Sequence, residues 1–342
     1  MGADPVIGAE HSRPHPSAPA ASPVGQAASR VSVIIPARNA AGSVGDIVRA
    51  VLAQQVPGVD TEVIVVDDAS TDDTAAEARA AGARVLALTG TRAGNPAAAR
   101  NLGARAARGD ILVFLDADCL PAEGWLQALL HAHNRGEAVA GGALDLPPAL
   151  PLSARCDYYC GWYHVHSRRP AGHVVNHPPA NLSVGRDLFL STSGFDERHP
   201  VAFAHEELAW QAELRRRGVP IYFEPKAVVL HRNRPGFGNL LRRNYRWGYS
   251  AIGSKAATGA ARMAWLYRYP RSLIALAPAS VPLQALYIVA CWVRAGVLEP
   301  LVMLPLVLAA RAAYAAGMLV GGIRWLRSRG TPGAVEIRPR WA

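Results

Sequence analysis

The segment GNPAAARNLGARAARGDILVFLDAD, residues 94–118, decides the fold that we expect for this chain. Its first part, Pro96 to Arg108, has the composition of a helix, and Gly109 is a residue that commonly ends one. Residues 111–115 form a short apolar run that predicts a buried strand, and acidic residues follow it at once. A helix that leads directly into a buried strand is typical of a βαβ unit.

Similar units lie upstream of this segment, because apolar runs that predict strands alternate there with helical patterns. The expected strands are 31–35, 62–66 and 84–88, and the expected helices are 43–54 and the segment that starts at Thr71-Asp72-Asp73-Thr74. Such alternation predicts an α/β fold with a Rossmann-like sheet and right-handed crossovers.

Acidic residues follow two of the expected strands. Asp67-Asp68 comes after the strand at 62–66, and Asp116-Ala117-Asp118 comes after the strand at 111–115. Ligands of such sheets bind beyond the carboxyl ends of the strands, so we expect both acidic pairs at one edge. Two acids one residue apart suit a hard divalent cation such as Mg²⁺, although a lone Asp-x-Asp is more often a polar turn.

The second half of the chain has weaker patterns. Residues 141–179 are irregular and rich in Pro, His, Tyr and Trp. Beyond them we expect short strands and two helices, the second of which is rich in arginine. The expected strands are 180–184, 221–224 and 227–231, and the expected helices are 205–217 and 236–260.

The 342 residues have a formal net charge of +10, and half of them are hydrophobic. Residues 272–293 have no charge and are long enough to cross a bilayer, while 301–323 is interrupted by Arg311. An arginine at mid-bilayer is costly, so the second stretch either spans with a partner for Arg311 or lies along the interface. A buried helical subdomain is the alternative. Arginines flank both stretches, which favours a membrane, rather than a nucleic acid, as the partner.

The four cysteines are too few for a disulfide-dense scaffold. Cys156 and Cys160 lie near His164 and His166, which makes a zinc site conceivable. Their spacing fits no common zinc module, so we do not expect one.

Several motifs in order identify a resemblance. They are VSVIIPARN at 31–39, VVDDASTDDT at 65–74, the segment at 94–118, ANLSVGRDLFLSTSGFDE at 180–197, EELAWQAELRRRG at 206–218 and YFEPKAVVLHR at 222–232. With them the chain resembles the family 2 glycosyltransferases, over about residues 31 to 235. The resemblance implies the glycosyltransferase A fold, that is, a Rossmann-like nucleotide-diphospho-sugar transferase fold, here with a C-terminal hydrophobic helical tail.

The resemblance implies a nucleoside-diphosphate-sugar donor and a Mg²⁺ or Mn²⁺ ion. The residues that it places at the nucleotide sugar are Pro36, Asn39, Asp67, Asp68, Arg100 and Asp116, and those that it places at the metal are Asp118, Asp116 and His231. Each has a plainer alternative. Asp67 and Asp68 would also suit a helix N-cap turn, Arg100 a solvated helix charge and His231 a structural histidine.

The family usually has Glu-Asp where this chain has Glu206-Glu207, and the second acid is the candidate catalytic base. We therefore expect Glu207, with Glu206 as the alternative, to take the proton of an acceptor hydroxyl. A solvated helix start is the plainer alternative.

On the acceptor side, the resemblance points to Asn181 and loosely to Arg243 and Trp247. The Gln-x-x-Arg-Trp pattern of processive relatives is absent, because Arg243 stands where Gln would, so we do not expect processive polymerisation. The expected acceptor is a lipid-linked sugar or a cell-envelope glycan.

These patterns divide the chain into five expected segments. They are a disordered lead-in at 1–29, a catalytic domain at 30–235, a basic helical linker at 236–271, hydrophobic membrane-associated helices at 272–323 and a basic tail at 324–342. The lead-in lacks the apolar core of a signal peptide, so we expect the catalytic domain on the cytoplasmic side of the cell membrane.

The expected function is inverting sugar transfer. A sugar nucleotidyltransferase is one rival, but it would need a glycine-rich phosphate loop after the first strand, and PARNAAGSVG is a poor version of it. A non-enzymatic membrane scaffold on a transferase fold is the other rival, and the intact acids argue against it.

Overall fold

The computed structural model describes residues 30–199, 204–259 and 264–328. The expected lead-in at 1–29 and most of the expected basic tail lie outside the described residues.

The described strands form one mixed sheet with the order β3-β2-β1-β4-β8-β6-β9-β5, and β7 pairs with β9. β1 runs parallel to β2 and β4, and β2 runs parallel to β3, as the sequence predicts. β8 is antiparallel to β4, which ends the parallel half. The strands are β1 (Arg30–Ala37), β2 (Asp60–Asp67), β3 (Arg84–Ala87), β4 (Ile111–Leu115), β5 (Cys119–Pro121), β6 (Val139–Asp145), β7 (Gly172–Val174), β8 (Asn181–Gly185) and β9 (Ile221–His231).

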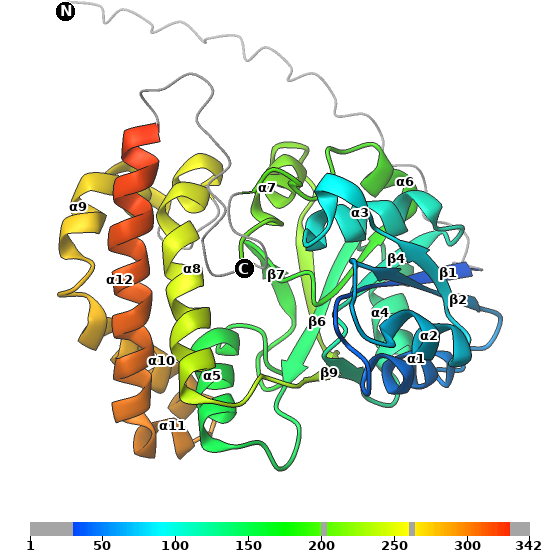
Figure 1. The fold of residues 1–342 in the computed structure, drawn as a ribbon, viewed down its shortest axis with the longest axis horizontal. Helices are drawn as coiled ribbons and strands as arrows, with labels where there is room; N and C mark the ends of the chain where they lie inside the picture. Colours follow the sequence, from blue (N-terminus) through cyan, green and yellow to red (C-terminus); the bar gives the residue numbers. More distant parts are fainter. Residues whose placement is uncertain (1–29, 200–203, 260–263, 329–342) are drawn as a thin grey trace, which may run out of the picture.

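Helices cover both faces of this sheet (Figure 1). In β1, Val33 and Ile35 pack with α1 and α4 on one face, whereas Ile34 packs with α3 on the other, because side chains of a strand alternate between faces. A short 3₁₀ helix at Gly90–Arg92 also belongs to this half of the molecule. The helices of this half are α1 (Val44–Leu52), α2 (Thr74–Ala80), α3 (Pro96–Ala106), α4 (Trp125–Asn134), α6 (Arg186–Leu190) and α7 (Leu208–Arg216).

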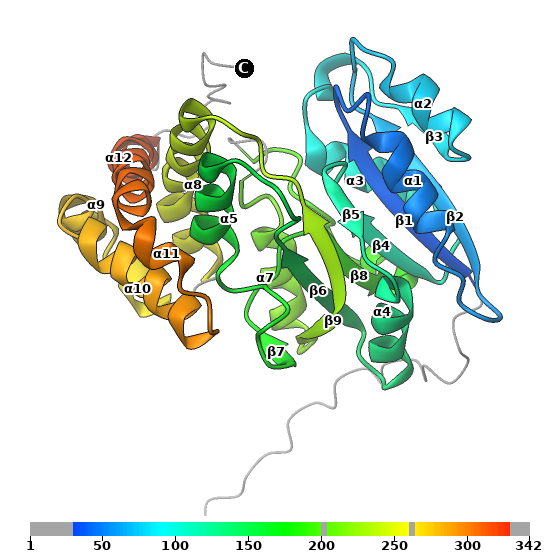
Figure 2. The same ribbon diagram turned by 90° about the horizontal axis from the view of Figure 1, so that it is seen from below.

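A helical layer stands beside the sheet and contains the last described helices of the chain (Figure 2). Within it, α12 lies along α8, and Ile252 of α8 packs with Ala315 and Met318 of α12. The helices of this layer are α5 (Leu152–Trp162), α8 (Phe237–Thr258), α9 (Pro270–Leu276), α10 (Val281–Arg294), α11 (Glu299–Val302) and α12 (Leu304–Ser328).

The region at 141–179 is more regular than its sequence predicts, because it contains most of β6, all of α5 and β7. Gly141 and Gly142 interrupt the apolar run in β6 that would otherwise predict a strand. A Cβ at Gly141 would lie 2.4 Å from the ring of His177, so only glycine fits there. In α5 nearly every residue from Ala154 to Trp162 is buried, and a helix without a polar face has no helical period in its sequence.

Two boundaries also differ from the prediction. Residues 221–231 form one strand, β9, whose pairing with β6 shifts register at Gly142 and Ala143, and not two strands. The helix expected at 205–217 begins later, at Leu208.

The uncharged stretch at 272–293 does not form one straight helix. Residues 270–276 and 281–294 form separate helices, α9 and α10, which meet at 90°. Pro282 lies in the first turn of α10, where proline is tolerated, and it could not lie inside a longer helix without breaking its hydrogen bonds. Among the described helices, α12 alone is long and apolar enough to cross a bilayer without a break. Its most apolar 18-residue segment has a mean hydropathy of 1.7, and 44% of that segment is buried.

Candidate active site

The carboxyl edge of the parallel strands contains the acidic residues, as predicted. β2 ends in Asp67, and the loop after it is bound to the loop after β1, because Asp68 N donates to Ala37 O at 2.8 Å. Asn39, which has φ of 49°, accepts from Thr71 N at 2.9 Å through its side-chain oxygen. These contacts fix the loops that the sequence analysis placed around a nucleotide.

Asp68 is buried and accepts a hydrogen bond from Gly94 N at 2.5 Å. Burial raises the pKa of its carboxyl, although the bond from Gly94 opposes that shift. Asp67 accepts from Ser70 N at 3.2 Å and pairs with Ala37 of β1, and Pro36 pairs with Val66, the residue before Asp67. The N-cap position of α2 belongs to Asp73, so the alternative that Asp67 or Asp68 caps this helix is wrong.

Arg100 joins two acidic centres that are far apart in the sequence. Its side chain, on α3, is only 3% exposed. Nη2 donates to Asp116 Oδ1 at 2.6 Å, and Nη1 donates to Glu206 Oε1 at 2.9 Å. Burial opposes its charge, but the two carboxylates outweigh burial and raise the pKa of the guanidinium. Arg100 is therefore no solvated helix charge, and the loop after β4 lies next to the segment before α7.

Glu207 follows in the chain, at the position before the first residue of α7, and it is buried. Burial raises the pKa of its carboxyl to about 8, and the negative charge of Glu206 acts in the same direction. A carboxyl whose pKa lies near the working pH is suited to general base catalysis. Because both acids are buried, the alternative of a solvated helix start is wrong.

A candidate cation site includes Asp118, two residues after Asp116 in the loop that follows β4. The ligand atoms of Asp118, Cys119 and His231 lie within 4.8 Å of one another, because β5 pairs with β9 and places Cys119 opposite His231. His231 Nε2 is 3.7 Å from Asp118 Oδ1, and its Nδ1 is 2.8 Å from Asn233 Oδ1. The side chain of Asp118 is 45% exposed, which leaves it accessible to a ligand.

These donors fit a hard divalent cation. Carboxylate oxygen and imidazole nitrogen are ligands that Mn²⁺ accepts, and two protein ligands leave positions for phosphate oxygens. Nε of Arg100 is buried without a hydrogen-bond partner in the described part of the chain, which also suits an anionic ligand. Asp116 turns one oxygen to Arg100 and is not part of the group around His231.

The predicted acceptor residues have different surroundings. Asn181 is fully buried, accepts from Trp125 Nε1 at 2.8 Å and donates to Ala143 O and Ala227 O. Its side chain holds β8 to its neighbours, so the structure does not support a contact of this side chain with an acceptor.

Arg243 and Trp247 do lie near the cation site. The guanidinium of Arg243 is 5.1 Å from the ring centre of Trp162 and 4.5 Å from that of Trp247. Trp162 also contacts the imidazole of His231, at 5.0 Å between ring centres. An arginine packed against two indoles therefore lies next to His231.

Sequence reasoning missed Asp157, Trp162 and Asn233, which surround His231 and Arg243. Asn233 was detectable in principle, because it follows His231 by two residues. Asp157 and Trp162 were not, because they lie in the helix α5, whose sequence has no recognisable period.

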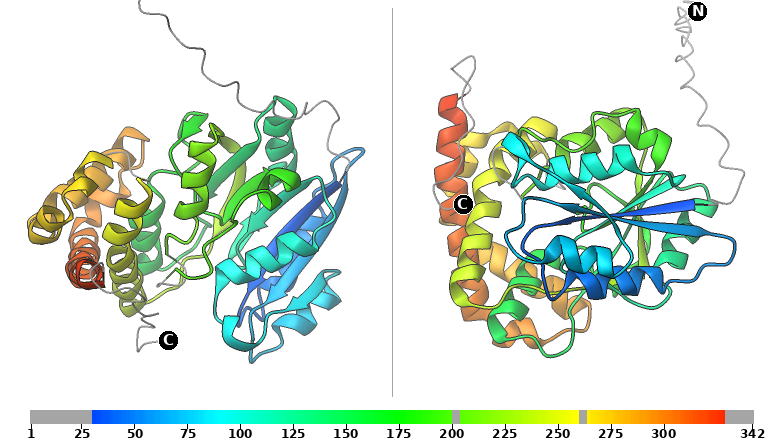
Figure 3. Two further views of the ribbon diagram at one scale, coloured as in Figure 1. Left: turned by 90° about the horizontal axis from the view of Figure 1, so that it is seen from above. Right: turned by 45° about the vertical axis from the view of Figure 1, so that its right-hand side comes forward.

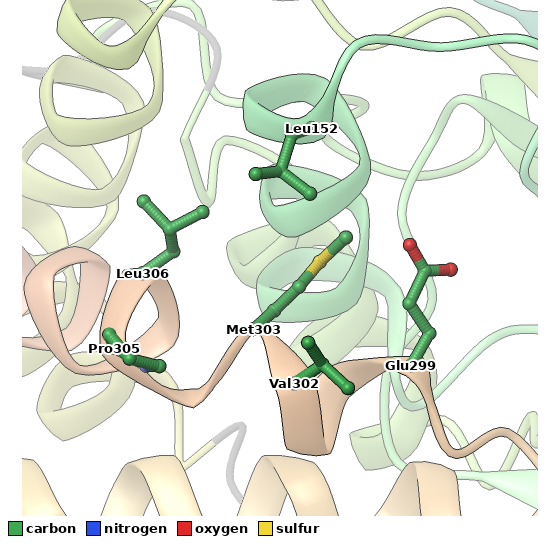
Figure 4. A pocket seen from close by; sticks show the side chains of 6 residues that line it. All are labelled: Leu152, Glu299, Val302, Met303, Pro305 and Leu306. Carbon is green, nitrogen blue, oxygen red and sulfur yellow. The ribbon is translucent and has the colours of Figure 1, made fainter.

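No other group of three His, Cys, Asp or Glu side chains in the described ranges has this close spacing, so the structure gives no support to a zinc site at Cys156 and Cys160. A cavity of about 280 Å³ lies elsewhere, between the start of α5 and α11–α12 (Figure 4). It is lined by Leu152, Glu299, Val302, Met303, Pro305 and Leu306, none of which belongs to the candidate site.

Comparison with solved structures defines the class of fold. The chain matches the mannosyltransferase PcManGT from Pyrobaculum calidifontis, solved with GDP-Man and Mn²⁺, with a TM-score of 0.58 and 20% identity over 89% of this chain and 88% of that one. The sheet is therefore that of a glycosyltransferase A fold. Residues 32–149 match the family described as glycosyl transferase family 2. These residues therefore form a family 2 glycosyltransferase domain.

Two curated relatives agree with this family. Glycosyltransferase AglE of Haloferax volcanii is 29% identical over 230 residues, which cover 65% of this chain and 73% of that protein. The pre-mycofactocin glycosyltransferase of Mycobacterium tuberculosis is 29% identical over 269 residues, which cover 71% of this chain and 53% of that protein. The matched part thus spans about half of the second relative.

Proposed function

We propose that this protein transfers a sugar from a nucleoside diphosphate to a hydroxyl acceptor, with inversion at the anomeric carbon. The observation that carries the proposal is the double ion pair of Arg100, which holds Asp116 and Glu206 in one place. Asp116 on the donor side and Glu206, the neighbour of the candidate base Glu207, therefore lie within the span of one guanidinium. The relatives AglE and PcManGT, named as glycosyltransferases, support this direction.

The donor would lie at the carboxyl edge of β1, β2 and β4. Pro36, Asn39, Asp67 and Asp68 would frame its base and ribose. Arg100 would face the diphosphate, where a guanidinium matches the geometry of phosphate oxygens.

Asp118 and His231, with Asp116 nearby, would hold a divalent cation, either Mg²⁺ or Mn²⁺. When bound, the cation supplies positive charge that stabilises the departing diphosphate. PcManGT was solved with Mn²⁺, which supports a divalent ion here.

Glu207 would accept the proton of the acceptor hydroxyl. The oxygen would form a bond to the anomeric carbon while the bond from that carbon to the diphosphate oxygen breaks, and the electron pair would leave with the diphosphate. General-base assistance of this kind contributes about 10²–10⁴-fold to a rate. Attack from the side opposite the diphosphate inverts the anomeric centre.

The acceptor would be a lipid-linked sugar or a cell-envelope glycan that approaches along Arg243 and Trp247. The apolar C-terminal layer would keep the protein at the cell membrane, with the catalytic domain on the cytoplasmic side. The length and composition of α12 support a membrane contact.

Release of nucleoside diphosphate from a panel of sugar nucleotides tests the proposal. We expect turnover with Mn²⁺ or Mg²⁺ and a loss of at least about 10²-fold in Asp118→Asn and Glu207→Gln. Asp187→Asn is the control, because that side chain is fully exposed on α6. Release of pyrophosphate instead would indicate a nucleotidyltransferase. Absence of both turnover and donor binding would indicate a scaffold.

A further inference from the structure

A buried carboxylate on α5 connects His231 to the group of Arg243, Trp162 and Trp247, which we call the acceptor wall. Asp157 has a side chain only 4% exposed. Its Oδ2 accepts from Asn233 Nδ2 at 2.7 Å and from Arg243 Nη1 at 2.6 Å. Its Oδ1 accepts from Asn244 Nδ2 at 3.4 Å. The carboxylate of Asp157 therefore accepts hydrogen bonds from three polar side chains and fixes their orientation.

The first of these contacts determines the orientation of an amide. An ionised carboxylate only accepts hydrogen bonds, so Asn233 must turn its NH₂ group toward Asp157. The amide oxygen of Asn233 then faces His231 Nδ1, at 2.8 Å. Because that oxygen is only an acceptor, the proton of the neutral imidazole must be on Nδ1. Nε2 keeps its lone pair and faces Asp118.

The second contact orients the acceptor wall. Asp157 fixes one nitrogen of the Arg243 guanidinium, and the rings of Trp162 and Trp247 hold its plane. Trp162 also contacts the imidazole of His231. Its indole therefore contacts both side chains that Asp157 positions, Arg243 directly and His231 through Asn233.

The third contact extends to the C-terminal helix. Asn244 is fully buried on α8, donates to Asp157 and accepts from Arg311 Nη2 of α12. Arg311 is buried too, which explains how the apolar helix tolerates it.

We propose that Asp157 is a positioning residue: through the amide of Asn233 it fixes the His231 tautomer that presents Nε2 to a divalent cation, and through Arg243 it fixes the acceptor wall. The cation part of this proposal rests on the proposed function. Residues that orient a metal-bound histidine typically change metal affinity by about 10–100-fold when they are removed.

The tautomer of His231 can be measured without a metal. Side-chain ¹⁵N spectra at about pH 8, above the usual pKa range of histidine, distinguish a protonated Nδ1 from a protonated Nε2. We expect Nδ1–H alone in the wild-type protein and a mixture in Asp157→Asn, because an asparagine no longer dictates the orientation of Asn233. Mn²⁺ binding, followed by electron paramagnetic resonance of free Mn²⁺, should weaken by about 10–100-fold in the same variant.

Two further variants separate the effect of Asp157 on His231 from its effect on Arg243. Arg243→Met leaves the contact of Asp157 with Asn233 in place, so we expect the Nδ1–H tautomer and Mn²⁺ affinity within about threefold of wild type. Asp145→Asn is the matched control, since that carboxylate on β6 accepts hydrogen bonds from the backbone and hydroxyl of Ser167, which is not one of the residues that Asp157 contacts. It should behave as the wild type does.

A wild-type tautomer and unchanged Mn²⁺ affinity in Asp157→Asn would overturn the proposal. If that variant does not fold, Asn233→Ala removes the link between Asp157 and His231 and leaves the contact of Asp157 with Arg243 in place. We then expect the mixture of tautomers and the weaker Mn²⁺ binding in Asn233→Ala. If the wild-type protein binds no Mn²⁺, the cation role in the proposed function fails. The ¹⁵N spectra then still decide whether Asp157 sets the tautomer.

Discussion

At the scale of single residues, the site is a set of buried charges that depend on one another. Arg100 has two carboxylate partners, and one of them, Glu206, is buried as deeply as Arg100 itself. Buried ion pairs add little net stability, but removing one partner is costly because it leaves an uncompensated charge. The residues of this site should therefore be sensitive to substitution for reasons of stability as well as chemistry.

Arg100→Met tests this dependence. Glu206 would stay buried without its cation, so we expect the free energy of unfolding to fall by about 3–5 kcal/mol. Urea denaturation measures it. Arg105→Met on the same helix is the control, because Arg105 is half exposed and its nearest carboxylate oxygen, on Glu197, is 3.9 Å away. That variant should stay within about 0.5 kcal/mol of wild type, and an equal loss in both would contradict the argument.

Glu207 predicts a dependence of stability on pH. Its carboxyl has a pKa of about 8 in the folded protein and an ordinary value of 4.5. Between these pH values the unfolded chain releases the proton while the folded protein keeps it, so stability falls as pH rises. Glu207→Gln removes this loss. Its Tm should match the wild type near pH 4 and exceed it by several degrees near pH 8, as measured by calorimetry.

Glu213→Gln should show the opposite sign. Burial opposes its charge, but bonds from Ser193 and Arg217 outweigh burial and lower the pKa of Glu213. That carboxylate therefore stabilises the fold at neutral pH, and its contribution disappears as pH falls through the lowered pKa. The same pH trend in both variants would show that the fold, and not the single carboxyl, determines the pH dependence.

Parts of this site were predictable from the sequence and others were not. Asp68, Asp116 and Asp118 follow strands whose carboxyl ends meet at one edge, so local pattern and topology suffice to bring them together. The contact of Arg100 with Glu206 spans 106 residues and depends on how α3 packs against the segment before α7, which no local pattern encodes. For the same reason Asn181, although it lies in a recognisable motif, has a structural role that the motif does not reveal.

At the scale of elements, α8 and α12 approach closely through glycines. A Cβ at Gly248 would lie 1.9 Å from Tyr314 O, and one at Gly317 would lie 2.1 Å from Tyr245 O. The two helices therefore touch backbone to backbone, on both sides of the contact. The sequence shows these glycines, but only the packed pair shows that they face one another.

Gly248→Ala tests this contact. The added methyl group has no space unless the helices separate, so we expect a loss of about 1–3 kcal/mol in the free energy of unfolding. Gly238→Ala, on the same helix, is the matched control, because no atom lies within 4 Å of a Cβ placed there. Alanine should leave stability unchanged at that position, or raise it by about 0.5–1 kcal/mol. A loss at position 238 as large as that at 248 would refute a specific helix contact.

At the scale of the whole molecule, the helical layer has one side that nothing in the described chain covers. α12 packs along α8, and α8 packs against α5 and α7, so α12 is held to the catalytic domain along its length. The outer side is formed by α9, α10 and α11 (Figure 3). The exposed apolar side chains of these helices and of the turn before α11 include Leu276, Leu283, Leu286, Leu298, Leu301 and Val302.

This outer side predicts attachment to an anionic membrane surface. Leu283 and Val302 are 70% and 85% exposed, and the exposed Arg268, Arg271 and Arg294 border them, which matches apolar burial combined with anionic head groups. The double variant Leu283→Glu with Val302→Glu should bind phosphatidylglycerol vesicles at least about tenfold more weakly in a flotation assay, because each buried aliphatic side chain contributes about 1.5–3 kcal/mol. Leu190→Glu, a half-exposed leucine on α6, should float as the wild type does. Equal binding of all three proteins would mean that the bilayer contacts another surface. Equal binding of the wild type to neutral and anionic vesicles would show that the arginines do not contribute.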